Sequence, residues 1–100
     1  MSRKLSDILA RLKSKYPALD KRIHESKALN AWDEAVGPII AKHARPLRVI
    51  DQNLWISVDH PIWRSEIHLR KRQIIDRINQ VAGGTYILDL FLADPKKSRD

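Results

Sequence analysis

The spacing of apolar residues changes twice along this chain. It follows a helical period of about 3.6 residues up to residue 36, alternates with a period of two over residues 46–59, and becomes helical again after Pro61. Two short alternating segments between helical ones predict a small sheet covered on one face by helices. At 100 residues the chain suits a single domain. We therefore expect an α+β fold in one domain over residues 1–93, followed by a short polar tail over residues 94–100.

The first half of the chain predicts two helices. Residues 2–16 place apolar side chains on one stripe of an amphipathic helix, which Pro17 ends. A second helix is expected from near Leu19 to Gly37, with Gly37 in a left-handed conformation and Pro38 opening a short further turn. Trp32 lies on the apolar side of this helix and is expected in the core.

The alternating segments predict a hairpin of two strands, residues 46–51 and 54–59, joined by Asp-Gln-Asn. Asn53 is the residue expected to take a positive φ in the turn. Strand alternation predicts that Leu47 and Val49 share one face. On the second strand it turns Trp55 away from the face that carries its apolar neighbours, Leu54, Ile56 and Val58.

One continuous helix is expected from Pro61 to the Gly-Gly pair at 83–84, and a final strand over residues 85–92. The helix has an apolar stripe that includes Trp63 and Ile67. Arg70 falls inside this stripe, and Arg64 and Lys71 lie along its edge. The predicted order is α-α-β-β-α-β, with the turn after Pro38 as a minor extra element.

Positive charge is unevenly placed. The net charge is +7, and the excess lies on residues 1–31 and 60–79. A basic surface attracts polyanions, so nucleic acid is the first partner to consider, although a merely solvated basic surface explains the charge equally well. The candidate phosphate-binding side chains are Lys4, Arg11, Lys15, Lys21 and Arg22 near the N-terminus, and Arg64, Lys71 and Arg72 on the later helix.

The sequence favours a protein that is not an enzyme. Its four histidines have no metal-ligand spacing, it has no cysteine, and it carries no nucleotide-binding loop or nucleophile elbow. We expect no cofactor, no metal and no small-molecule substrate. No apolar run is long enough for a membrane span, so we expect a cytoplasmic protein without a membrane partner.

Spaced residues from Trp32 to Ile78 resemble the DciA family of bacterial helicase-loading proteins. The resemblance rests on Val36-Gly37, on Leu-Trp-Ile-Ser-Val over residues 54–58, on Trp63 with Glu66 and Ile67, and on Arg-Ile-Asn over residues 77–79, and it covers about two-thirds of the chain. The chain departs from the family at Asn53, where glycine is usual, at Arg70, where an apolar residue is usual, and in stopping at Asp100, where many members extend into a long tail.

The resemblance implies a KH-like domain that contacts a DnaB-type hexameric helicase, binds DNA and associates with the nucleoid. The chain lacks the Gly-x-x-Gly loop of KH domains that read single strands, so we expect phosphate contacts on single-stranded or fork DNA with little sequence preference. Trp55, Trp63 and Arg70 are the candidate partner-binding residues. The alignment of Trp63 with Ile67 and Ile74 favours an anchoring role in the core over a partner contact, and Trp55 is also suited to stack a base. The alternatives are a general nucleic-acid-binding module, for RNA as well as DNA, and a structural adaptor.

Overall fold

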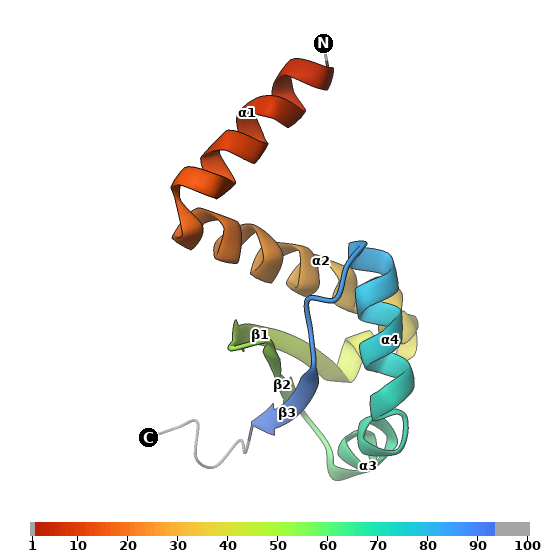
Figure 1. Ribbon diagram of the computed structural model, residues 1–100. Coiled ribbons are helices and arrows are strands. Elements are labelled where there is room, and N and C mark those ends of the chain that lie inside the picture. The colour runs from red at the N-terminus through yellow and green to blue at the C-terminus, as the bar shows by residue number, and fades with distance from the viewer. Residues whose placement is uncertain (1, 94–100) are drawn as a thin grey trace.

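The computed structural model describes residues 2–93, apart from the side chains of residues 2, 3 and 13. Four helices and three strands follow one another in the order α-α-β-β-α-α-β (Figure 1). They are α1 (Ser2–Lys15), α2 (Pro17–His43), β1 (Ala44–Ile50), β2 (Asn53–Val58), α3 (Pro61–Leu69), α4 (Lys71–Ala82) and β3 (Asp89–Ala93). The predicted α+β class is confirmed. The polar tail predicted at 94–100 lies outside the described residues.

The strands form one mixed sheet in the order β1-β2-β3. β1 and β2 are antiparallel, and β3 pairs with β2 in parallel. A parallel pair needs a long crossover, which α3 and α4 provide. The core lies between the sheet and the helices α2 and α4; its largest fully buried side chains are Trp32, Leu54, Ile56, Ile67, Ile78, Ile87 and Val58.

The helix α1 forms as predicted, but its apolar stripe does not enter the core. Figure 1 shows α1 projecting away from the sheet and the other helices. Leu5 and Ile8 on this stripe remain 62% and 52% exposed. The main contact of α1 is with α2, which begins at Pro17, two residues earlier than predicted, because proline fits the first turn of a helix.

Gly37 has the positive φ predicted for it, and this conformation interrupts α2. Its φ of 87° and ψ of 165° lie in a region that is essentially restricted to glycine. Pro38 then opens further helical turns that run to His43, beyond the predicted short turn. This break directs the chain from the helix layer into β1.

The single helix predicted from Pro61 onwards is wrong, because the chain breaks at Arg70 into α3 and α4. Arg70 has φ −100° and ψ 12°, and its N–H still donates to the Glu66 carbonyl at 3.1 Å. Nothing in the local sequence disfavours helix here. The break lets α3 contact β2 while α4 packs along α2, so tertiary packing overrides helix propensity.

The hairpin turn is shorter than predicted and the expectation for Asn53 is wrong. Asp51 and Gln52 take the positive φ values, 50° and 65°, while Asn53 already pairs with Ile50. A two-residue turn with positive φ at both positions matches the twist of the flanking strands. The Gln52 carbonyl also accepts a hydrogen bond from the Leu88 N–H at 2.8 Å, which ties the turn to the segment before β3.

The prediction that Leu47 and Val49 share a face is also wrong. Val49 is buried and Leu47 is exposed, because the pairing register shifts between Pro46 and Arg48. The extra residue of such a bulge reverses the alternation beyond it. The alternation predicted for β2 is confirmed, with Leu54, Ile56 and Val58 buried.

The last strand begins four residues later than predicted, at Asp89. Within the segment 85–88, the backbone of residues 86 and 87 is held by a side chain in place of a partner strand. Asn79 on α4 accepts hydrogen bonds from the N–H groups of Tyr86 and Ile87, at 3.0 and 2.9 Å, and its amide donates to the Ile87 carbonyl at 2.9 Å. Ile87 is thereby buried while the segment stays irregular.

Candidate nucleic-acid interface

The sheet face opposite the core carries a row of side chains that crosses all three strands. Arg48 on β1 pairs with Trp55 on β2, and Trp55 pairs with Phe91 on β3. The Trp55 and Phe91 rings are stacked, with centroids 5.1 Å apart and an interplanar angle of 25°. Phe91 is 37% exposed and Trp55 is half-buried, so within residues 2–93 this face is open to solvent.

Cationic side chains border this aromatic pair at both edges of the sheet. On β1, Arg48 and Arg45 are exposed. At the β3 edge, the Lys71 amine lies 5.9 Å from the Phe91 ring centroid. Nearby, Arg64 donates from Nη1 to the Ala93 carbonyl at 3.0 Å. We refer to the surface formed by Arg45, Arg48, Trp55, Phe91, Lys71 and Arg64 as the open sheet face.

The Asp89 carboxylate borders the open sheet face beside Lys71. Asp89 accepts a hydrogen bond from Lys71 at 2.6 Å and another from the Leu90 N–H at 2.8 Å. These two contacts, the one with Lys71 first, hold the pKa of Asp89 below its ordinary value of 3.8. The charge of Lys71 is therefore partly matched. Among the described residues, no carboxylate forms an ion pair with Arg45 or Arg48.

The lowered pKa of Asp89 predicts a pH dependence of stability. A carboxyl whose pKa is depressed by folding stabilises the folded state fully above its ordinary value of 3.8 and loses that contribution as pH falls through the folded pKa. Asp89→Asn should therefore have a lower Tm than the wild type at neutral pH, and the gap should close in acid. Thermal unfolding across this range tests it, with Asp76→Asn, an exposed position on α4, as the control. A gap that widens in acid would contradict the assignment.

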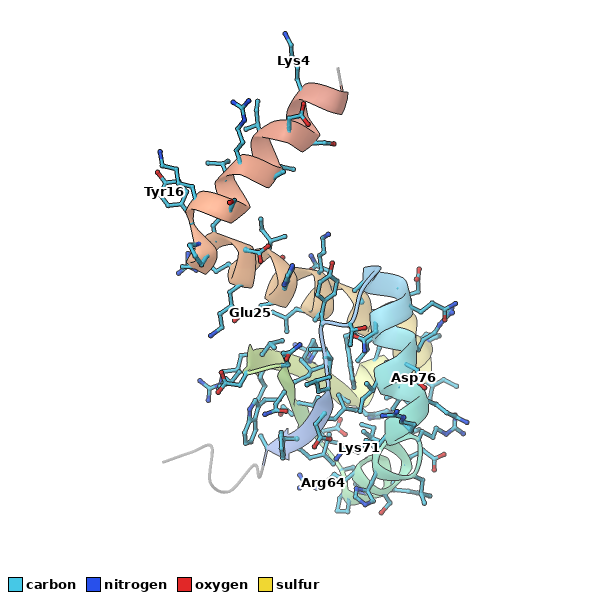
Figure 2. The ribbon with its side chains drawn as sticks, viewed as in Figure 1. Lys4, Tyr16, Glu25, Arg64, Lys71 and Asp76 are labelled. Carbon is cyan, nitrogen blue, oxygen red and sulfur yellow. The ribbon has the colours of Figure 1, made fainter. Side chains whose placement is uncertain are left out.

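The predicted phosphate-binding residues fall into two separate groups. Figure 2 shows Lys4 near the free end of α1 and Arg64 and Lys71 at the opposite end of the molecule, whose longest dimension is 47 Å. Those on α1 and the start of α2 are all exposed, namely Lys4, Arg11, Lys15, Lys21 and Arg22. Arg72 is exposed on α4. The two groups do not form one continuous patch.

Trp63 packs against the core and keeps part of its ring accessible. Its ring stacks on His43 with centroids 4.6 Å apart and an interplanar angle of 9°, and it packs against the buried core. His43 is held in turn by Asp59, with Nδ1 3.1 Å from Oδ2. The ring is only half-buried, and its remaining surface lines a groove.

This groove, of about 490 Å³, lies between α3 and the turn that follows Gly37. Its walls include Ile39 and Ile62, which are 65% and 64% exposed. At its rim, Arg70 donates from Nε to the Glu66 carboxylate at 3.0 Å. We call it the Trp63 groove. It is an apolar surface bordered by one ion pair.

Three residues of the open sheet face were not identified from the sequence: Arg45, Arg48 and Phe91. Strand alternation contained part of the signal, because Phe91 follows the buried Leu90 and Arg48 precedes the buried Val49. The bulge obscured the first strand, and the parallel pairing of β3 with β2 leaves no local trace in the sequence.

The described residues contain neither a cluster of metal-ligating side chains nor a helix able to span a membrane. No group of three or more histidine, cysteine, aspartate or glutamate side chains is placed to hold a metal ion in this part of the chain. None of the helices described within residues 2–93 has the length and apolar character needed to cross a membrane.

Comparison with known proteins identifies similar sequences. The family model described as "Dna[CI] antecedent, DciA" matches residues 4–91. A UPF0232 protein of Corynebacterium glutamicum is 32% identical over 65 residues, covering 65% of this chain and 36% of that relative. UPF0232 proteins of Mycobacterium tuberculosis and Rhodococcus jostii are each 27% identical over 74 residues, covering 74% of this chain and 40% and 39% of theirs. The chain thus spans less than half the length of these curated relatives.

Proposed function

Because this chain belongs to the DciA family, we propose that it is a DNA-binding accessory protein that contacts the DnaB-type replicative helicase and assists its loading on DNA. The observation that carries the proposal is the extent of the family match. Residues 4–91 include α1 from its third residue, the Trp63 groove, and the sheet up to the third residue of β3. The proposed role is one of binding and not of catalysis.

The Trp63 groove is the proposed contact with the helicase. Tryptophan and arginine are enriched at the centres of protein interfaces, and here Trp63 is held rigidly by His43 with Arg70 at the rim. Exposed Ile39 and Ile62 add apolar area that a partner can cover. The groove therefore places an aromatic ring that is stacked on His43 beside accessible aliphatic side chains.

The proposed DNA contacts are the basic side chains at the two ends of the molecule. They suit contacts to phosphates, which carry no sequence information. At one end they are Lys4, Arg11, Lys15, Lys21 and Arg22, and at the other Arg64, Lys71 and Arg72. Simultaneous binding of helicase and DNA raises the local concentration of the helicase at single-stranded or fork DNA. This effect is the proposed means of assisting loading.

Size-exclusion chromatography with the DnaB-type helicase of the same organism tests the helicase contact. We expect co-elution that survives nuclease treatment, and its loss in Trp63→Ala because the groove loses its rigid ring. Leu88→Ala, which shortens an exposed apolar side chain outside the groove, is the matched control. Co-elution that requires DNA would overturn the direct contact.

The second candidate is a nucleic-acid-binding module, for RNA or DNA, without a helicase partner. The open sheet face favours it, because aromatic rings between cations suit nucleic acid whatever the protein partner. In that case an oligonucleotide shifts the elution of the protein and the helicase does not. A structural adaptor that uses its charge only for solubility would instead bind oligonucleotides weakly, with a salt dependence near zero.

A further inference from the structure

We infer that the open sheet face binds single-stranded nucleic acid by stacking bases on the Trp55–Phe91 pair, with the adjoining phosphates held by cations at the two edges of the sheet. This inference rests on the proposed nucleic-acid binding and deepens it, since it names the strand form and the site. It assigns Trp55 to nucleic acid and leaves Trp63 and Arg70 to the protein partner.

The first argument is the arrangement of the rings. Trp55 and Phe91 come from neighbouring strands at the same register position and stack on each other. Both side chains point away from the core, where the alternating positions Leu54, Ile56 and Leu90 are buried. The β-sheet fixes the backbone beneath the rings, so the platform is formed before a ligand arrives. Bases of any sequence stack on such aromatic side chains.

The second argument is charge. The row across the sheet begins with Arg48, passes through the two rings and ends with the Lys71 amine, 5.9 Å from the Phe91 centroid. Arg45 and Arg64 lie at the same two edges, next to Ser57 and Ala93 respectively. A single strand of nucleic acid whose bases stack on the two rings has a cationic side chain on either side of it. In the free protein the Lys71 amine is paired with the Asp89 carboxylate. When nucleic acid binds, a phosphate replaces this carboxylate as the partner of Lys71.

The third argument separates single strands from duplex. In a duplex the faces of the bases are covered by their neighbours, so only phosphates and groove edges are available to a flat surface. The three strands, about 4.8 Å apart, make a face only about 10 Å wide. Such a narrow platform provides few phosphate or groove contacts for a duplex, whereas its aromatic rings can stack unpaired bases.

Tryptophan fluorescence during titration with oligothymidine tests the inference. Trp32 is fully buried and Trp63 is stacked on His43, so Trp55 is the reporter for this face. We expect quenching in the wild type, and roughly 10-fold weaker binding in Trp55→Ala, measured by anisotropy of a labelled strand. Trp55→Phe should keep the affinity within about threefold yet lose the quenching, a result that a purely structural role of Trp55 does not produce.

Matched charge variants complete the experiment. Arg48→Gln should weaken single-strand binding several-fold more than Arg77→Gln, which removes the same charge from α4, where Arg77 contacts Gln80. Trp55→Ala should leave duplex binding unchanged, and oligouridine in place of oligothymidine shows whether the site accepts RNA as well. Wild-type binding that is indifferent to Trp55 and Arg48 would overturn the inference and leave the proposed function standing. A wild type that binds no oligonucleotide would overturn both.

Discussion

Replacing Trp32 with alanine is expected to remove most of the folding stability of the domain. Its side chain is 0% exposed, and its Nε1–H donates to the Ala44 carbonyl at 2.9 Å. It therefore joins α2 to the first residue of β1 in the centre of the core. Truncating such a side chain costs about 3–5 kcal/mol, and the orphaned carbonyl adds about 1–3 kcal/mol. Domains of this kind are stable by only about 5–15 kcal/mol in total.

Urea and thermal unfolding followed by circular dichroism measure this loss. Trp32→Phe is the informative companion, because it keeps an aromatic ring in the core while removing the hydrogen bond to Ala44 and part of the volume. We expect the alanine variant to be unfolded, or its Tm lowered by more than roughly 15 °C, and the phenylalanine variant to lie between it and the wild type. An alanine variant that melts within a few degrees of the wild type would show that Trp32 does not hold the core together.

The parts of the fold that the sequence predicted are those governed by local periodicity. Alternation on residues 54–58 places Leu54, Ile56 and Val58 on one face, because successive side chains of a strand point in opposite directions. The helical spacing of apolar residues around Trp32 placed that residue in the core, because side chains three and four positions apart share one face of a helix. In both cases the decisive neighbours lie within a few positions along the chain.

The parts that were predicted wrongly depend on contacts between distant residues. The break at Arg70 follows from the packing of α3 and α4 on different partners. The late start of β3 follows from Asn79, whose side chain bonds to residues 86 and 87. Periodicity within a window of the sequence does not contain these contacts, so it extended the helix and the strand too far.

The open sheet face was predicted in fragments. Arg64 and Lys71 were identified as phosphate-binding residues on one predicted helix, and Trp55 as a partner-binding residue on a strand, without a link between the two. The parallel pairing of β3 with β2 brings Phe91 beside Trp55 and places Asp89 against Lys71. A site formed by strand order becomes visible only when that order is known, since residues 55 and 91 are distant in the sequence.

Replacing Asn79 with alanine is expected to cost about 2–4 kcal/mol of folding stability. The Asn79 side chain makes three hydrogen bonds to the backbone of Tyr86 and Ile87, each with a net value of about 1 kcal/mol. Removal of this side chain also takes away partners of backbone groups that are partly buried. Alanine is the better helix former, which offsets roughly 0.5 kcal/mol of the loss. The neighbouring Gln80→Ala, at an exposed position of the same helix, should change stability by less than about 0.5 kcal/mol.

Hydrogen exchange locates the effect of Asn79→Ala within the fold. The amides of Tyr86 and Ile87 should lose protection more than the amides of β1 and β2, because both donate to the Asn79 side chain. The loss should be larger at Ile87, since the Tyr86 N–H also donates to the Gly84 carbonyl at 3.0 Å. Asn79→Asp keeps the side-chain acceptor and loses the donor to the Ile87 carbonyl, so it should retain more of the protection than alanine does.

Residues 86–88 lead directly into β3, and freeing them loosens the strand that carries Phe91. We therefore expect Asn79→Ala to weaken single-strand binding as well, although its side chain lies outside the open sheet face. Unchanged protection at Tyr86 and Ile87 would mean that pairing with β2 alone holds β3 in place.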